Sequence, residues 1–286
     1  MTRPLSSNPG FTVDLDSPLP SYESPPVVEV VVGVALKPIA GLTVAHLGAF
    51  WSQPIISRHF PKVEEQATLI PPVENFTGGQ PLSISLALGQ TAPRLWLLND
   101  DGEELVQLQR DWFACNWRKV GPESTYGRWP QRRKALTRWF GEFADFVEKN
   151  ELGRVEPTQC EITYVDHVPT QDFGSSTHAG LNRLLRLVEP PERLLGQGPE
   201  QTYLSSTYVI PDDDGKPIGR LHVDAQPAFR RNDNVPIYVL NFTARGRPEG
   251  EGLDGALQFL KRGRYWAVTA FAELTTKEMQ HKWGRK

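Results

Sequence analysis

The chain has 286 residues, of which 39 % are hydrophobic and 23 % are charged, and its formal net charge is −3. This length and composition are typical of a globular protein with a substantial core, in one large domain or two small ones. The small net charge excludes a general attraction to nucleic acid or anionic membranes. No segment reaches the ~18 consecutive apolar residues of a membrane span.

Residues 1–25 are rich in proline and serine, which predicts a mobile arm or an extended strap. The amino terminus lacks the apolar region of a secretory signal. The two cysteines, Cys115 and Cys160, indicate buried reduced thiols and no disulfide framework. These features predict a protein of the cytoplasm.

Residues 26–168 are expected to form a first half of the body. A β-branched run after Pro25-Pro26 predicts a buried strand. A helix follows Thr43, and Pro54 is expected to end or kink it. Further strands are predicted at 82–88, 94–98, 105–119 and 160–168, and a stripe of apolar residues from 136 to 147 predicts a long helix.

Residues 169–200 mix Gly, Pro, Ser and Leu and are expected to connect the halves. The second half, 201–286, shows strands at 203–210, 218–225 and 235–245 and a helix at 253–274. Each half has a hairpin with an Asp-Gly turn and a long aromatic helix. The sequence therefore predicts an α+β fold, in which antiparallel sheets of hairpins pack against long aromatic-rich helices, with two similar halves.

The segment 107–118 carries polar side chains at almost every position. Read as one strand, alternation places Gln107, Gln109, Asp111 and Trp117 on one face and Asn116 and Arg118 on the other. Polar groups on both faces favour either a hydrogen-bonded sheet under a loop or a groove for a ligand or partner. In the second interpretation, Asn116 and Arg118 are polar anchors.

A second candidate is the basic and aromatic region 117–139. Its members include Trp129, Arg132 and Arg133. Positive charge beside aromatic rings is typical of surfaces that bind single-stranded nucleic acid. The alternative is a solvated helix face whose aromatic residues turn inward to the core.

Motifs for metals, cofactors or nucleophilic catalysis are absent from the sequence. It has no zinc-ligand spacing, no phosphate-binding glycine loop and no Gly-x-Ser-x-Gly. Asp166 and His167 are an acid and an imidazole, but neighbours on a strand point to opposite faces. A small-ligand or hydrolytic pocket near Arg118, Asp166 and His167 is kept as a further alternative.

Several landmarks together resemble a sporadically distributed bacterial protein family that is known mainly by a numbered sequence model and has no assigned activity. They are Pro25 to Val30, Phe50-Trp51, Phe60-Pro61, Glu64 to Gln66, Pro93 to Trp96, Gln107 to Arg118, Glu161 to Val165 and the tail from Phe271 to Gly284. The resemblance spans about 22–286. It implies an accessory or defence-linked bacterial protein, and Asp166 stands where the family is expected to have Asn.

The leading hypothesis is a non-enzymatic cytoplasmic binding protein without cofactor or metal. It would recognise another protein through the 107–118 segment and the adjoining helices, since aromatic residues and arginine are enriched at interfaces. Nucleic-acid binding through 117–139 is the alternative.

Overall fold

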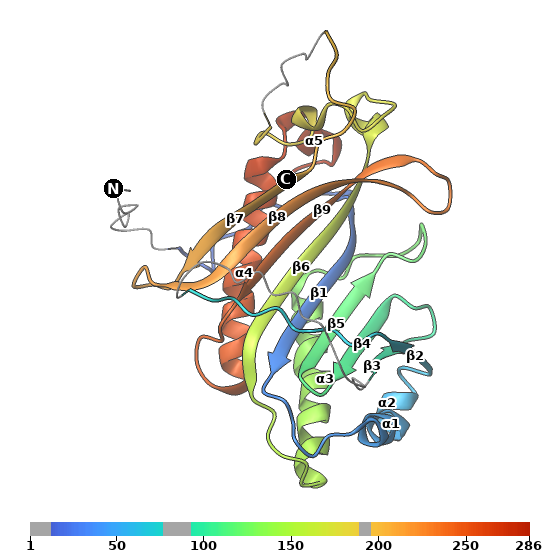
Figure 1. Cartoon of the computed structure of the whole chain (residues 1–286), viewed down its shortest axis with the longest axis vertical. Helices are drawn as coiled ribbons and strands as arrows, with labels where there is room; N and C mark the ends of the chain where they lie inside the picture. Colours follow the sequence, from blue (N-terminus) through green and yellow to red (C-terminus); the bar gives the residue numbers. More distant parts are fainter. Residues whose placement is uncertain (1–12, 77–92, 189–195) are drawn as a thin grey trace.

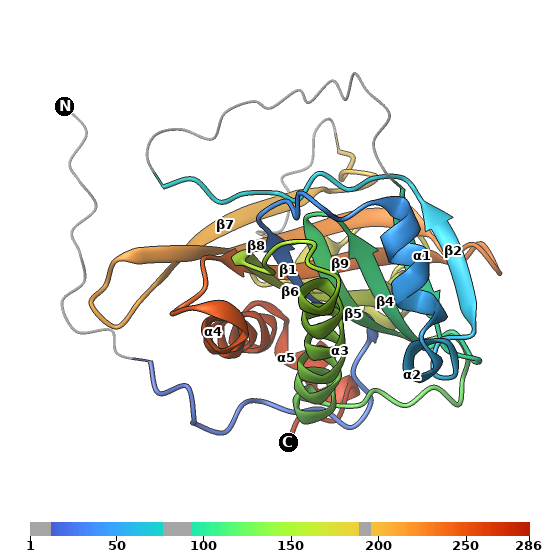
Figure 2. The same ribbon diagram turned by 90° about the horizontal axis from the view of Figure 1, so that it is seen from below.

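The described part of the chain, residues 13–76, 93–188 and 196–286 of a computed structural model, folds around one antiparallel sheet of nine strands. Two long helices, α3 (Trp129–Lys149) and α4 (Gly252–Leu274), lie on the same face of this sheet (Figures 1 and 2). The predicted α+β class is confirmed. The strands are β1 (Val27–Leu36), β2 (Lys62–Gln66), β3 (Arg94–Leu98), β4 (Glu104–Gln109), β5 (Trp112–Arg118), β6 (Pro157–Pro169), β7 (Leu204–Pro211), β8 (Pro217–Phe229) and β9 (Pro236–Gly246).

The order of these strands is symmetric about the centre of the sheet. From the centre outward it reads β1, β5, β4, β3 on one side and β6, β9, β8, β7 on the other, with β2 added at the first edge. Helix α3 follows β5, and α4 follows β9. The layout outward from β1 matches the layout outward from β6. The predicted first half, 26–168, contains β6, so the predicted boundary does not coincide with the centre of the sheet.

Strand β1 lies at the middle of the sheet because its sequence suits burial on both faces. Val30, Val32 and Val34 are fully buried on the helix side, where β-branched side chains pack well against neighbouring strands. The strand pairs with β5 on one side and β6 on the other, and its backbone groups are satisfied along both edges.

The aromatic stripe of α3 packs on the first half of the sheet as predicted. Phe143 stacks on Phe113 of β5 with ring centroids 5.5 Å apart, and Phe50 of α1 (Val44–Ser52) packs against Phe143 at the same distance. Helix α1 ends before Pro54, which begins the short α2 (Pro54–Ser57). Proline suits this first helical turn because the missing N–H needs no partner there.

In the second half, α4 approaches the sheet closely through two glycines. Gly219 of β8 pairs with Gly246 of β9, and the fully buried ring of Phe259 lies over both. A Cβ atom added at Gly246 would lie 2.4 Å from the Phe259 ring and 2.4 Å from the Ile218 carbonyl oxygen. These two positions have no room for a side chain.

One predicted strand is wrong. The segment 105–119 is not a single return strand, because the chain turns at Arg110-Asp111 and forms the hairpin of β4 and β5. The alternation rule fails across such a turn, since it applies only within one strand. The predicted strand 82–88 lies outside the described residues.

The two ends of the described chain are tied together. The N-terminal strap, residues 13–26, runs beside the C-terminal tail after α5 (Lys277–Lys282), and the Glu23 N–H donates to the Gly284 carbonyl at 3.1 Å. Tyr22 is buried and packs edge-on against Phe271, with centroids 5.3 Å apart. The described part of the predicted arm is therefore an ordered strap.

Candidate functional site

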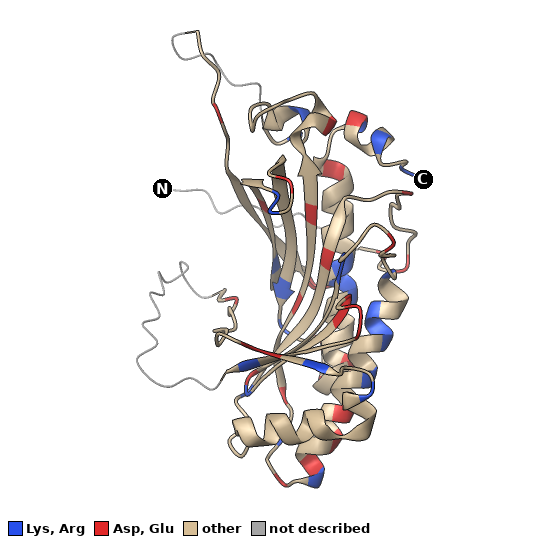
Figure 3. Cartoon of the chain, turned by 90° about the vertical axis from the view of Figure 1, so that its right-hand side faces the viewer, with Lys and Arg blue, Asp and Glu red and all other residues tan. Residues whose placement is uncertain are grey.

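The face of the sheet opposite the long helices is here called the open face. In Figure 3 the sheet is seen from the side, with the helices on one face and charged strand positions of both signs. Alternation along the strands and the pairing register place a mixed set of polar side chains on the open face. The set includes Glu29, Arg94, Gln107, Gln109, Asn116, Arg118, Gln159, Glu161, Thr163, Arg220, His222, Asp224, Asn241, Thr243 and Arg245.

Residues 67–76, called the 67–76 segment, cross this face after β2 as an extended chain (Figure 1). The side-chain amide of Gln109 makes two hydrogen bonds to the backbone of Leu69 in this segment. The Leu69 N–H donates to Gln109 Oε1 at 2.9 Å, and Gln109 Nε2 donates to the Leu69 carbonyl at 2.7 Å. The Glu74 N–H donates to Gln159 Oε1 at 3.4 Å. The open face thus binds the backbone of an extended segment through side-chain amides.

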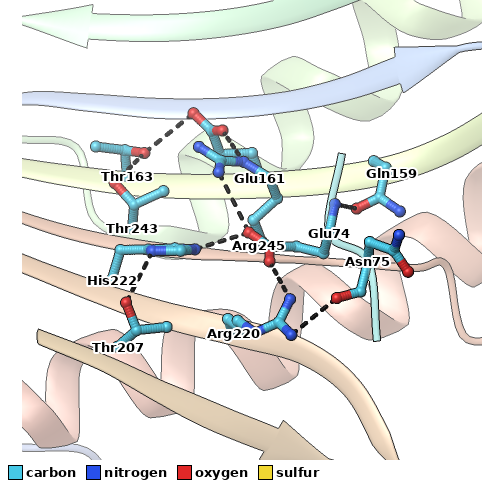
Figure 4. A network of polar contacts seen from close by, with 10 residues as sticks. All are labelled: Glu74, Asn75, Gln159, Glu161, Thr163, Thr207, Arg220, His222, Thr243 and Arg245. Carbon is cyan, nitrogen blue, oxygen red and sulfur yellow. Dashed lines mark hydrogen bonds and ion pairs between the residues drawn. The ribbon is translucent and has the colours of Figure 1, made fainter. Parts of the chain in front are cut away.

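The carboxylate of Glu74 lies in a cluster of basic groups from β8 and β9 (Figure 4). Arg220 Nη1 donates to Glu74 Oε2 at 2.6 Å, and His222 Nε2 lies 2.7 Å from Glu74 Oε1. Arg245 Nη1 lies 3.3 Å from Oε1, and its Nε donates to Glu161 Oε2 at 2.7 Å. Arg220 also donates to the Asn75 carbonyl at 2.9 Å, so the cluster binds both side chain and backbone.

The electrostatics of this cluster favour an ionised carboxylate. Burial of Glu74, which is 6 % exposed, acts to raise its pKa. Hydrogen bonds from His222 and Arg220 and the charge of Arg245 outweigh that effect and lower the pKa to about 2. The site is therefore built to hold a negative charge.

The first half of the sheet carries a second polar chain on the same face. Arg94 Nη1 donates to Gln107 Oε1 at 2.8 Å, and Gln107 Nε2 donates to Asn116 Oδ1 at 2.9 Å. Asn116 Nδ2 then donates to Glu29 Oε1 at 2.6 Å. These hydrogen bonds link four strands, β3, β4, β5 and β1. At the β3 end, the centroid of the Trp96 ring lies 5.6 Å from the Arg94 guanidinium.

The structure divides the residues that the sequence predicted as a binding surface. Gln107, Gln109, Asn116 and Arg118 lie together on the open face, although alternation had assigned them to opposite faces. Asp111 lies in the β4–β5 turn and accepts a hydrogen bond from Gln109. The remaining predicted residues lie on the helix side: Trp117, Trp129, Arg132 and Arg133.

Arg132 has a structural role within the core. It is 5 % exposed, and its Nη2 donates to Glu104 Oε1 at 2.6 Å. We expect Arg132→Gln to lower the free energy of unfolding by about 3 kcal/mol, the low end for a broken buried pair because Glu104 keeps contact with solvent. The neighbouring Arg133 is exposed, so Arg133→Gln is the matched control and should change stability by less than ~0.5 kcal/mol. Urea denaturation measures both, and equal effects would contradict the structural role.

A cavity of about 110 Å³ lies on the helix side of the sheet, between the N-terminal strap, the start of α3, β6 and α4. Its lining includes Asp166, which is only 3 % exposed. Burial raises the pKa of Asp166 to about 8. The other lining residues are Pro20, Ser21, Tyr22, Pro25, Val27, Tyr126, Arg128, Trp129, Tyr164, Phe242, Arg264, Ala267, Val268 and Phe271.

Asp166 and His167 lie on opposite sides of the sheet, as alternation predicts. His167 and Arg118 line a surface depression on the open side together with Arg230. Burial and the charge of Arg230 lower the pKa of His167. Arg118 and His167 therefore line the same depression, and Asp166 lines the separate cavity on the helix side.

Sequence reasoning missed Glu74 and its basic partners. Glu74 stands in an irregular proline-containing stretch, and the alternation on β8 that aligns Arg220 with His222 also fits an ordinary exposed strand. Within residues 13–76, 93–188 and 196–286, no group of three or more His, Cys, Asp or Glu side chains is arranged to hold a metal ion. Among the described helices, none has the length and apolar character needed to cross a membrane.

These features define an α+β protein with one nine-stranded sheet, a polar face crossed by the 67–76 segment and a separate cavity on the helix side. Comparisons with protein-family models, with curated proteins and with solved structures find no match to this chain. The family resemblance drawn from the sequence stays a prediction.

Proposed function

We propose that this chain is a non-enzymatic cytoplasmic binding protein that recognises an extended acidic segment of another protein on its open face. The observation that supports this proposal is the 67–76 segment itself. The open face holds its backbone through Gln109 and Gln159 and its carboxylate through Arg220. A partner peptide that presents the same groups would make the same contacts.

The charge pattern favours a peptide over nucleic acid. Acidic Glu29, Glu161 and Asp224 alternate with the arginines of the open face, and they would repel a run of phosphates. In the basic region 117–139, Trp117 and Trp139 are buried in the core. They present no ring face on which a base can stack.

A competition experiment tests the proposal. The Glu74→Gln variant removes the charge of the internal segment, and charged hydrogen bonds contribute about 1.5–3 kcal/mol each. We expect a fluorescent peptide with the sequence of residues 67–76 to bind this variant about 30-fold more tightly than it binds the unmodified chain. Fluorescence anisotropy measures the affinity.

Two controls make the result specific. Glu65→Gln changes an exposed glutamate on β2 and should leave peptide affinity unchanged. A peptide carrying Gln at the position of Glu74 should bind the Glu74→Gln variant at least tenfold more weakly than the acidic peptide. If both peptides bind equally, or if neither binds to the Glu74→Gln variant, the open face is not a site for acidic segments.

A further inference from the structure

The Asp166 cavity, the 110 Å³ space on the helix side, has no part in the proposed peptide site. The open face and the cavity lie on opposite sides of the sheet, because Asp166 and His167 are neighbours on β6 and point in opposite directions. The cavity therefore needs its own explanation.

The carboxyl group of Asp166 has no compensating partner. In the described part of the chain no side chain or backbone group makes a hydrogen bond or ion pair with it, and burial is the sole cause of its raised pKa. Burying an uncompensated carboxylate is costly. The group therefore holds a proton at neutral pH while no cation pairs with it.

The two arginines of the lining are engaged elsewhere. Arg264 lies over the Trp129 ring, 5.8 Å from its centroid, and hydrogen-bonds Tyr164. Arg128 Nη2 donates to the Tyr22 carbonyl at 3.3 Å. Neither guanidinium supplies the charge that Asp166 lacks.

Six of the fifteen residues that line the cavity are aromatic. These aromatic residues are Tyr22, Tyr126, Trp129, Tyr164, Phe242 and Phe271. Aromatic faces attract cations, and such walls recognise ammonium groups in other proteins. The volume is somewhat below the ~150 Å³ of an engineered cavity that admits benzene, so the occupant must be small.

We propose that the Asp166 cavity binds a small organic cation, an amine or alkylammonium, whose charge pairs with the Asp166 carboxylate and whose apolar body contacts the aromatic walls. This site is independent of the peptide-binding face. Its ligand is a cation, whereas the segment proposed to bind the open face is acidic.

Proton linkage gives the site a measurable signature. The titratable and charged groups that face Asp166 are Tyr22 on the strap, Tyr126 and Arg128 before α3, Tyr164 on β6 and Arg264 on α4. Burial raises the pKa of each of these tyrosines, so none ionises near neutral pH. Asp166 is therefore the group that loses its proton when a cation enters.

The test uses three probes of similar size: tetramethylammonium, neutral tert-butanol and anionic pivalate. Tryptophan fluorescence reports binding because Trp129 lines the cavity. We expect tetramethylammonium to bind at least tenfold more tightly than tert-butanol at pH 9, and pivalate not to bind. Because Asp166 must be ionised, the affinity for tetramethylammonium should fall about 100-fold from pH 9 to pH 6.

Variants separate this site from non-specific effects. Asp166→Asn should weaken tetramethylammonium binding at least 30-fold and leave tert-butanol binding unchanged. The matched control Asp224→Asn changes a carboxylate on the open face and should alter neither. The proposal would be overturned by equal affinity for the cation and the alcohol or by a preference for pivalate. It would also be overturned by a pH-independent affinity in the unmodified chain, a measurement that does not depend on whether a variant folds.

Discussion

Asp166→Asn is expected to raise the free energy of unfolding by about 6 kcal/mol at pH 9 and to leave it nearly unchanged at pH 4. Folding raises the pKa of this carboxyl from 3.8 to about 8. At a pH below 3.8 both the folded and unfolded states are protonated, and the group costs nothing. Between these two values the unfolded state is ionised and the folded state is not, so stability falls as pH rises. Asparagine never ionises and escapes this loss.

Urea denaturation at pH 4, 6 and 9 measures the effect. The difference between Asp166→Asn and the unmodified chain should grow between pH 4 and pH 8 and then level off. Asp224→Asn, in the partly exposed carboxylate of β8, should give a difference of less than ~0.5 kcal/mol at every pH. Parallel pH curves for Asp166→Asn and the unmodified chain would show that the carboxyl has no raised pKa.

Gly246→Ala is expected to lower the free energy of unfolding by about 3 kcal/mol. The new methyl group would meet the Phe259 ring and the Ile218 carbonyl oxygen, each 2.4 Å away. Overpacking a core typically costs 1–3 kcal/mol. We expect the upper value of this cost because one of the two contacts is with a backbone oxygen, which cannot move away by a change of rotamer.

Gly141→Ala on α3 is the matched control. A Cβ at Gly141 would meet nothing within 4 Å, and alanine favours a helix over glycine by up to about 1 kcal/mol. This substitution should therefore stabilise the protein. Thermal and urea unfolding of the two variants should shift in opposite directions, and a neutral Gly246→Ala would mean that α4 packs less closely on β8 and β9.

Much of the fold is predictable because its signals are local. The valine run of β1, the aromatic stripe of α3 and the Asp-Gly turn between β7 and β8 each specify an element within a few residues. The turn at Arg110-Asp111 escapes prediction because Asp111 stands there without the Gly, Pro or Asn that would strengthen the turn signal, and polar residues continue through it. The common sheet depends on the pairing of β1 with β6, a contact between distant segments that no local pattern indicates.

The candidate sites also differ in how far local sequence patterns indicate them. The sequence points to Gln107, Asn116 and Arg118 because polar residues are unusual along a buried strand. It cannot indicate Glu74, whose role depends on contacts with residues 146 and 171 positions away. It also cannot indicate the Asp166 cavity, which is lined by the strap, both long helices, β6 and β9.

The covalent attachment of the 67–76 segment sets a threshold for any partner on the open face. A tethered ligand competes at an effective concentration that is on the order of millimolar for a short flexible linker. An external peptide that reproduces only the contacts of the tethered one stays unbound at cellular micromolar levels. Under the proposed function, a partner must therefore also engage the polar chain from Arg94 to Glu29 in order to displace the tethered segment.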